Sequence, residues 1–367
     1  MNQTVMDEKN CREAAFAFAY YKKDLPTSSD DTLTIEPLSG GLINHSYKIS
    51  SNSKAPFLLQ EINQHVFKKP DKLQQNYINI WQFAEFEFTD VNLPAPLYYD
   101  RGKTLYRDKN GKYWRAFEFM DNTKTHAVPG TPSQAKSTAK AFAKLTAAFD
   151  DYNLGELHIV IPDFHNLTFR YEQFLDSLEG ENYERMAKAL PMIEEIKSRE
   201  RYKHFYEVIT SSAEFPQRLY HHDAKISNVL FRKSNGRVLC VVDLDTAMPG
   251  FYFSDLGDMI RSMACSHDES STEFDQLQIR KDYYRAIVEG YLDIMSKYFT
   301  ASEKKYIHYS GLIMIYMQAI RFLGDYLNGD VYYKTTYPEQ NYDRAMNQLT
   351  LLKRLEEFLK GEYDYKL

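Results

Sequence analysis

Residues 220–228 read Tyr-His-His-Asp-Ala-Lys-Ile-Ser-Asn, and the chain continues to residue 243 as two strand-like runs separated by Ser-Asn-Gly at 234–236. Asn-Gly is the strongest short-range signal for a β-hairpin. A two-residue loop places Asn228 opposite Asp243, and a three-residue loop places Asn228 opposite the residue before it. Both registers bring Asn228 next to Asp243, and a third oxygen-bearing side chain, Asp223, lies five residues upstream.

These three side chains suit phosphoryl transfer. Mg²⁺ prefers carboxylate and carboxamide oxygens, so Asn228 and Asp243 can form part of its shell, and Asp223 can accept the proton of an attacking hydroxyl. One alternative gives Asp223 and Asn228 only structural hydrogen bonds in a turn. Another is a transition-metal site on residues 221–223, but no further ligands follow at the usual spacing. Asp245 either joins the outer shell of the metal or hydrogen-bonds the loop.

This stretch resembles the catalytic loop of the aminoglycoside phosphotransferase and choline kinase superfamily, which reads His-x-Asp-x4-Asn and precedes a hairpin and a metal-binding Asp. The resemblance implies an ATP-dependent kinase with Asp223 as the catalytic base and Mg²⁺ on Asn228 and Asp243. It also implies that His221 and Asp255 support the loop. The chain has no Asp-Phe-Gly or Ala-Pro-Glu signal and no room for an activation segment between Asp243 and Asp255, which disfavours a protein kinase.

Hydrophobic periodicity agrees with the two-lobed, protein-kinase-like α+β fold that the resemblance implies. The first lobe, residues 1–121, is expected to be an antiparallel sheet with helices at 9–21 and 71–85, the latter capped by Asp71. Its strands are expected in a hairpin over 32–50 and at 56–62, 104–107 and 114–120. The second lobe, residues 122–367, begins its helices at Thr131-Pro132, and further helices are expected near 167–178, 182–197, 199–212, 275–298, 303–328 and 340–360.

The first lobe contains the expected nucleotide site. Gly40 and Gly41 lie between two strands, where backbone amides freed by glycine can face phosphate oxygens. The resemblance implies that the backbone of Glu118 and Met120 contacts adenine. Gln60 stands where the superfamily usually presents Lys or Arg to the phosphates, and a carboxamide supplies no charge. A non-catalytic nucleotide-binding module is therefore the alternative from a different class.

Several blocks resemble the N-acetylhexosamine 1-kinases, and they lie at residues 41–47, 59–63, 66–68, 161–166, 242–250 and 321–330. That resemblance implies transfer to the anomeric hydroxyl of N-acetylglucosamine or N-acetylgalactosamine, with His45, Arg321 and Tyr332 contacting the sugar. The structural alternatives are that His45 is a hairpin residue, that Arg321 pairs with Asp325 and that Tyr332 belongs to the core. Other acceptors of the same fold class are an aminoglycoside, choline or an unacetylated hexose.

Composition limits the partners. The formal net charge of −6 leaves no electrostatic footprint for nucleic acid or an anionic membrane. Three scattered cysteines are too few for a disulfide framework, which favours a reducing compartment. The start of the chain lacks the apolar core of a signal peptide, and the most apolar run, residues 311–320, is too short to span a bilayer. We therefore expect a cytoplasmic protein whose partners are a nucleotide and a small molecule.

Overall fold

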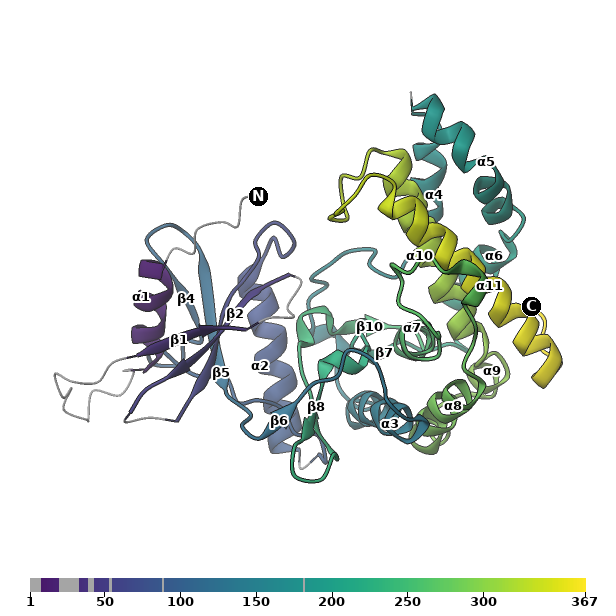
Figure 1. The fold of residues 1–367 in the computed structure, drawn as a ribbon. Helices are drawn as coiled ribbons and strands as arrows, with labels where there is room; N and C mark the ends of the chain where they lie inside the picture. The colour runs from purple at the N-terminus through teal and green to yellow at the C-terminus, as the bar shows by residue number, and fades with distance from the viewer. Residues whose placement is uncertain (1–7, 20–32, 39–42, 53–54, 88, 181) are drawn as a thin grey trace. The chain divides into compact units, whose positions relative to one another are not determined.

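The computed structural model describes residues 8–19, 33–38, 43–52, 55–87, 89–180 and 182–367, and the chain forms two compact units (Figure 1). The first contains residues 1–123 and 155–161, and the second contains residues 124–154 and 162–367. Residues 155–161 thus return to the first unit after the chain has entered the second. The side chain of Asn76 holds them there, because its Nδ2 donates to the His158 carbonyl and its Oδ1 accepts the His158 N–H, both at 2.8 Å.

The first unit is a five-stranded antiparallel sheet in the order β1-β2-β3-β5-β4, with one helix on each face (Figure 1). Alternate residues of the strands, such as Leu59 and Trp114, pack with helix α1 in a hydrophobic core. On the opposite face, Phe117 lies 4.5 Å from Tyr77 of helix α2, measured between ring centroids. The elements are α1 (Glu8–Ala19), β1 (Thr34–Pro37), β2 (His45–Ser50), β3 (Phe57–Glu61), α2 (Pro70–Phe86), β4 (Leu105–Arg107) and β5 (Tyr113–Glu118).

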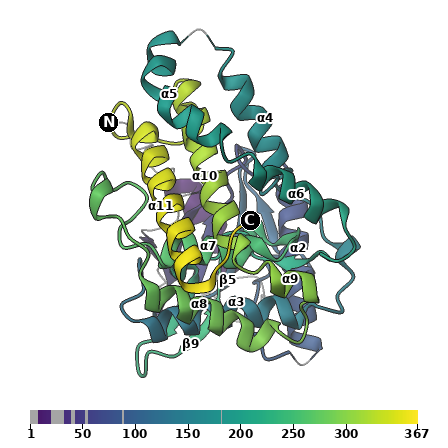
Figure 2. The same ribbon diagram turned by 90° about the vertical axis from the view of Figure 1, so that its right-hand side faces the viewer.

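The second unit is mostly helical, and short strands flank the loop of residues 221–228 that contains Asp223 (Figures 1 and 2). Its helices are α3 (Pro132–Ala148), α4 (Leu167–Ser177), α5 (Tyr183–Lys197), α6 (Arg201–Ser211), α7 (Phe253–Met263), α8 (Lys281–Met295), α9 (Ala301–Lys305), α10 (Tyr309–Leu327) and α11 (Gln340–Tyr363). Its strands are β7 (Arg218–Tyr220), β8 (Val229–Arg232), β9 (Val238–Val241) and β10 (Met248–Gly250), and β6 (Thr123–Lys124) lies at the junction of the units.

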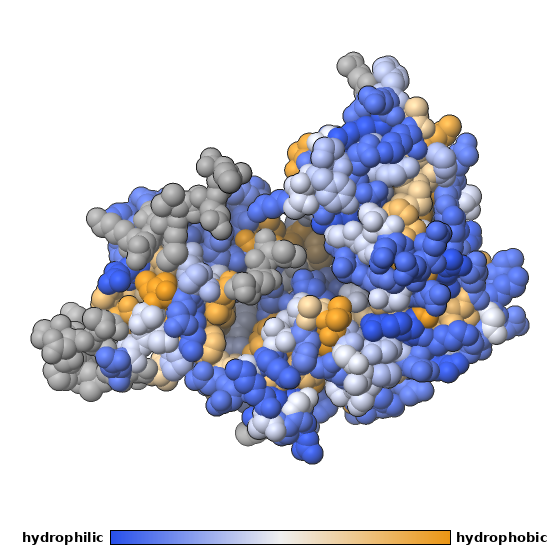
Figure 3. All heavy atoms as spheres, viewed as in Figure 1, coloured by the Kyte–Doolittle hydropathy of each residue, from blue (hydrophilic) through white to orange (hydrophobic). Residues whose placement is uncertain are grey.

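Helix α10 forms the centre of the second unit. It is buried on all sides, as a helix that is apolar all round must be, and it contacts α4, α7 and α11. No helix in the described part of the chain is long and apolar enough to cross a membrane. On the face seen in Figure 3, hydrophilic side chains cover most of this unit and hydrophobic ones are scattered among them.

Three predicted helix boundaries are wrong, each for a local reason. Asp71 does not cap α2: the helix begins at Pro70, so Asp71 lies in its first turn, where a negative charge still faces the helix dipole favourably. Helix α8 begins at Lys281 and not at 275, because the preceding chain forms a 3₁₀ turn and a β-bridge between Cys265 and Ile279. The helix predicted over 303–328 is two helices, α9 and α10, separated by a turn at 306–308.

Candidate active site

Asp255, in the first turn of α7, holds the loop that follows β7. Its side chain is fully buried, and its two oxygens accept the backbone N–H groups of His221 at 3.0 Å and His222 at 2.8 Å. Burial raises the pKa of Asp255 to about 6, although the neighbouring His221 and the two N–H donors favour the charged form. The carboxylate thus fixes the backbone immediately before Asp223.

His221 links this loop to the hairpin. Its ring Nδ1 accepts the N–H of Asp223 at 3.3 Å, so the proton lies on Nε2, which donates to the carbonyl of Val242 at 3.0 Å. The His221 carbonyl accepts the hydroxyl of Thr246 at 2.6 Å. Its ring also meets Phe142 edge-on at 5.1 Å. His221 therefore connects the residue before Asp243 with Asp223.

His222 turns the chain toward Asp223. It adopts a left-handed backbone conformation (φ 65°), and its Nδ1 donates to the carbonyl of Tyr220 at 3.0 Å. Burial lowers the pKa of His222 to about 4, so the ring is neutral at pH 7. A Cβ at Gly250 would lie 2.4 Å from Nε2 of this ring, so only glycine fits on the adjoining strand β10.

Asp223 is held by two side chains from its own loop. Its Oδ2 accepts the amide of Asn228 and pairs with the ammonium of Lys225, both at 2.9 Å. Burial raises the pKa of Asp223, but Lys225, His221 and Asn228 outweigh it and hold the pKa below its usual range. Asp223 is therefore ionised at pH 7. Lys225, two residues downstream, was given no role by the sequence analysis, although it lies within the quoted stretch.

The hairpin brings Asn228 next to Asp243 as predicted, but with a different loop length and a bulge. Arg232 pairs with Arg237, so the loop has four residues instead of two or three. A bulge on β9 then adds one residue, Leu239, and restores the register that a three-residue loop would have given. The N–H of Val242 donates to the carbonyl of Asn228 at 2.9 Å, so Asp243 directly follows the cross-strand partner of Asn228.

The predicted nucleotide residues belong to the first unit. Gly40 and Gly41 lie outside the described residues. Glu118 ends β5, and its N–H donates to the carbonyl of Ala95 at 2.8 Å. Met120 lies beyond the strand, and its carbonyl accepts the hydroxyl of Thr123 at 2.6 Å.

Gln60 lies beside a guanidinium. Arg115 is its cross-strand partner on β5 and donates from Nε to the Gln60 carbonyl oxygen at 3.2 Å. On the other side, the Gln60 amide donates to the hydroxyl of Ser46 at 2.9 Å. The charge missing at position 60 is thus present on the neighbouring strand, which sequence spacing could not reveal.

The three predicted sugar contacts are divided between the units. His45 begins β2 of the first unit, whereas Arg321 on α10 and Tyr332 after it line a pocket of about 210 Å³ in the second. Arg321 does not pair with Asp325: its Nη1 donates to Gln318 at 3.3 Å. Tyr332 is exposed and not part of the core. Within the second unit, the structure brings Arg321 and Tyr332 together.

A family model described as "Phosphotransferase enzyme family" matches residues 34–291, which is more than half of the chain. The chain belongs to this family. Its antiparallel-sheet unit and helical unit agree with the kinase-like fold of phosphotransferases, so the fold predicted from the sequence is confirmed.

Solved structures of phosphotransferases have the same fold. A microcompartment-associated aminopropanol kinase aligns with a TM-score of 0.60 at 14% identity, over 95% of this chain and 98% of the other. The GDP complex of aminoglycoside 2'-phosphotransferase-IIIa aligns with a TM-score of 0.56 at 10% identity, over 93% and 98%. The ethanolamine kinase of Plasmodium vivax aligns with a TM-score of 0.51 at 13% identity, over 86% and 82%. At such identities the similarity extends to the fold alone.

The donor set of this phosphotransferase fits a magnesium ion. The side-chain Nδ2 of Asn228 donates to the Asp223 backbone carbonyl and to Asp223 Oδ2, so the side-chain Oδ1 of Asn228 is the atom that can serve as a ligand. Asp243 adds a carboxylate two residues beyond the end of β9. Among the described residues, no cluster of three or more His, Cys, Asp or Glu suits a metal. Two oxygen ligands plus water and phosphate match the sparse protein shell of Mg²⁺.

Proposed function

We propose that the protein transfers the γ-phosphoryl group of ATP to a hydroxyl of a small molecule, with Asp223 as the catalytic base. The observation that carries this proposal is the state of the Asp223 carboxylate. Its Oδ2 is engaged by Asn228 and Lys225, and no described residue bonds its Oδ1. An ionised carboxylate with one engaged oxygen can receive the acceptor hydroxyl on the other and accept its proton.

Lys225 gives the site its positive charge. It keeps Asp223 ionised, and the carboxylates of Asp258 and Asp243 contribute with Asp223 to raising the pKa of its ammonium despite burial. A fixed cation beside the base would attract the negative charge of the transferring phosphoryl group.

Asn228 and Asp243 would hold the magnesium ion, which neutralises phosphate charge when bound. We expect Asp243→Ala to weaken Mg–ATP binding by about tenfold or more, because phosphate charge is then less neutralised. Isothermal titration with ATP in the presence and absence of Mg²⁺ measures this change. Unchanged Mg–ATP affinity in the variant would show that Asp243 is not a magnesium ligand.

As the acceptor we propose an N-acetylhexosamine, phosphorylated at its anomeric oxygen. The support is the series of sequence blocks that resemble N-acetylhexosamine 1-kinases, together with Arg321 and Tyr332 on one pocket of the second unit. Arg321 supplies donors for hydroxyl or acetamide oxygens, and a tyrosine ring offers a flat face to a sugar ring. His45 is proposed as a further contact from the first unit.

A coupled ADP-release assay across hexosamines, choline and aminoglycosides tests both the proposed phosphoryl transfer and the proposed acceptor. We expect turnover with N-acetylhexosamines and a product whose phosphorus NMR spectrum places phosphate on the anomeric oxygen. Asp223→Asn is the control, and we expect kcat to fall about 10²- to 10⁴-fold with ATP affinity nearly unchanged. Transfer to another hydroxyl or acceptor would remove the amino-sugar assignment, and near-native turnover of the variant would remove Asp223 as the base.

Gln60 favours one further candidate, a module that binds nucleotide without transferring phosphate. The neighbouring Arg115 weakens that reading, because a guanidinium charge accompanies the carboxamide. The same assay separates the two: metal-dependent turnover supports the enzyme, and ATP binding without turnover of any acceptor supports the module.

A further inference from the structure

The pocket beside Arg321 has the chemistry of an anion site. It lies in the second unit between α4 and the end of α10 and is lined by Arg170, Gln173, Phe174, Ile320, Arg321, Gly324, Asp325, Asn328, Tyr332 and Tyr333. Its volume of about 210 Å³ is below the roughly 300–1,000 Å³ of pockets that enclose a whole drug-sized ligand. The pocket therefore suits one end of a ligand.

Two guanidinium groups share this pocket without an ion-pair partner among the described residues. Arg170 donates from Nη1 to Gln173 at 2.8 Å and from Nη2 to the Phe164 carbonyl at 3.5 Å, both neutral acceptors. Its buried Nε has no acceptor in the part of the chain that the structure describes. Arg321 likewise donates to a neutral acceptor, Gln318. The two charges are thus positioned but not neutralised by contact.

The only carboxylate in the lining, Asp325, is directed elsewhere. Its Oδ1 accepts the N–H groups of Val331 and Tyr332, and its Oδ2 accepts those of Tyr333 and the Asn341 amide, all between 2.8 and 3.0 Å. Four donors on one carboxylate satisfy its acceptor capacity. Asp325 builds the wall of the pocket and forms no ion pair with either arginine.

The surroundings of the two arginines favour a negative ligand. Arg321 lies over the rings of Phe164, Tyr332 and Tyr333, with its Cζ 5.5–5.8 Å from their centroids. Burial lowers the pKa of Arg170, and the charge of Arg321 lowers it further, so the two cations repel each other in a partly desolvated space. A guanidinium fork matches the paired oxygens of a carboxylate, sulfate or phosphate. An anion in the pocket would offset both the repulsion between the two cations and the energetic cost of burying their charges.

We propose that this pocket binds a negatively charged substituent of the acceptor, either a carboxylate or a sulfate ester, so that the substrate is an acidic sugar. This inference rests on the proposed function, because it concerns the acceptor of the same transfer. A chain of ring contacts leads from the pocket to the catalytic loop: Arg321 lies over Phe164, Phe164 stacks on His165 at 4.7 Å, and His165 meets His222 at 5.1 Å. His222 directly precedes Asp223. The two arginines would equally disfavour an amino alcohol or an aminoglycoside.

The test compares acceptors that share one N-acetylated sugar ring and differ in whether the substituent at carbon 6 is charged. Initial rates of ADP release are measured with N-acetylglucosamine, with its 6-sulfate and with the corresponding N-acetylated uronic acid, so the last two distinguish sulfate from carboxylate. We expect KM for at least one acidic acceptor to be about tenfold or more below that of the neutral parent, since desolvated charge pairs bind strongly. The advantage should shrink as salt is raised from about 0.01 to 1 M, because screening weakens partly exposed charge pairs.

Arg170→Met should remove the advantage, raising KM for the acidic acceptor about tenfold while the KM of the neutral parent changes less than about threefold. Arg170→Lys keeps the charge and should retain part of the preference, and Lys297→Met removes an exposed charge from the same unit and should change neither value. A neutral or cationic acceptor with the lowest KM, or an equal effect of Arg170→Met on all acceptors, would overturn the inference.

A binding measurement separates this inference from the proposed function. Sodium sulfate is titrated into the Asp223→Asn chain saturated with Mg–ADP, and the shift in melting temperature is recorded against sodium chloride of equal ionic strength. We expect a rise in melting temperature with sulfate that Arg170→Met abolishes. If no acceptor is phosphorylated but this rise is present and lost in Arg170→Met, the anion pocket stands and the kinase proposal falls. If transfer occurs without the rise and without acidic preference, the reverse holds.

Discussion

Asp255 and Asp325 each fix a loop of the second unit through hydrogen bonds to its backbone, and the two loops carry different side chains. Each is a buried helix carboxylate that accepts backbone N–H groups of a loop, two from residues 221–222 in one case and three from residues 331–333 in the other. Asp255 lies in the first turn of α7, where the helix dipole favours a negative charge, and Asp325 lies near the end of α10, where it does not. Asp325 correspondingly gains a fourth donor from Asn341.

The two loops present different chemistry. The loop held by Asp255 carries the ionised Asp223, and its own two rings, His221 and His222, are buried and hydrogen-bonded. The loop held by Asp325 carries Tyr332, which is exposed, and Tyr333, whose rings surround Arg321. One carboxylate thus positions the proposed base, and the other positions the rings around the proposed acceptor pocket. Mutations at the two aspartates should therefore separate turnover from acceptor binding.

Of the two loop-holding aspartates, Asp255 is expected to give the larger effect when it is changed, as Asp255→Asn. The amide replaces one acceptor oxygen with an NH₂ group that faces a backbone N–H donor, and leaving such a donor unpaired costs about 1–3 kcal/mol, or about 5- to 150-fold in kcat. KM for the acceptor should stay within about twofold. Steady-state kinetics measures both values, with Asp282→Asn, an exposed first-turn aspartate of α8, as the control. Equal loss in the control, or a raised acceptor KM with normal kcat, would contradict the assigned role.

The pKa of Asp255 also predicts a pH dependence. Because this pKa is raised from 3.8 to about 6, the carboxylate gains its proton as pH falls through 6, and kcat should decline on that acid limb. Stability changes in the opposite direction. A group that binds its proton more tightly in the folded chain contributes stability below pH 3.8 that is lost as pH rises through 6. A pH profile of kcat in the wild type and in Asp255→Asn, which should lack this limb, measures the effect.

A smaller and differently placed effect is expected from Asp325→Asn. Loss of one acceptor oxygen loosens residues 331–333 and the walls around Arg321, so acceptor KM should rise about tenfold for a cost near 1.4 kcal/mol. kcat and the KM of ATP should change less than about twofold. Asp343→Asn, which changes a half-buried aspartate of α11 that accepts the hydroxyl of Tyr337, is the matched control. A fall in kcat without a change in acceptor KM would mean that the two loops are not functionally distinct.

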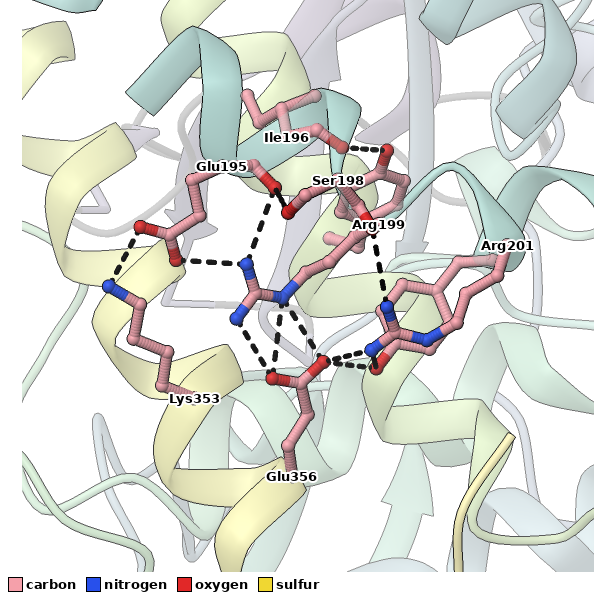
Figure 4. A network of polar contacts seen from close by, with 9 residues as sticks. Glu195, Ile196, Ser198, Arg199, Arg201, Lys353 and Glu356 are labelled. Carbon is pink, nitrogen blue, oxygen red and sulfur yellow. Dashed lines mark hydrogen bonds and ion pairs between the residues drawn. The ribbon is translucent and has the colours of Figure 1, made fainter. Parts of the chain in front are cut away.

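The smallest kinetic effect is expected away from both loops, in a charged network between α5, α6 and α11 (Figure 4). Glu356 pairs with Arg199 at 2.9 Å and with Arg201 at 2.7 Å, and it accepts the hydroxyl of Tyr202 at 2.5 Å. Glu356→Gln should lower the free energy of unfolding by about 1–2 kcal/mol, because partly buried charged hydrogen bonds are weakened. Both kcat and KM should be unchanged.

Urea denaturation measures the change at Glu356, and Glu357→Gln is the control. Glu357 is more exposed and makes one ion pair at 3.4 Å, so its loss should cost less than about 0.5 kcal/mol. A kinetic defect in Glu356→Gln at a temperature where the chain is folded would show that the network reaches one of the two loops.

Local signals predicted much of this arrangement. The hairpin after Asn228 follows from Asn-Gly and the alternation of its strands. Helix α3 begins at Pro132 as expected, and the side chain of Thr131 caps it by accepting the Gln134 N–H. The bulge at Leu239 could not be predicted, because a longer loop with a bulge and a shorter loop without one give the same register near Asn228.

Contacts between residues far apart in the sequence could not be predicted from spacing. Arg170 and Arg321 meet from helices about 150 residues apart, and Arg115 lies beside Gln60 only because β3 and β5 are neighbours in the sheet. Helix α7 was not predicted, since it is buried almost throughout and its polar Asp255 and Asp258 obscure the apolar pattern.

Helices α7 and α10 approach each other so closely at Gly257 that a Cβ there would lie 2.2 Å from the carbonyl oxygen of Ser310. One of these helices carries Asp255 and the other carries Arg321 and Asp325. Any heavier residue at position 257 would drive the two helices apart and change the spacing between Asp255 and Arg321. The distance between the proposed base and the proposed acceptor pocket therefore depends on a residue that has no side chain.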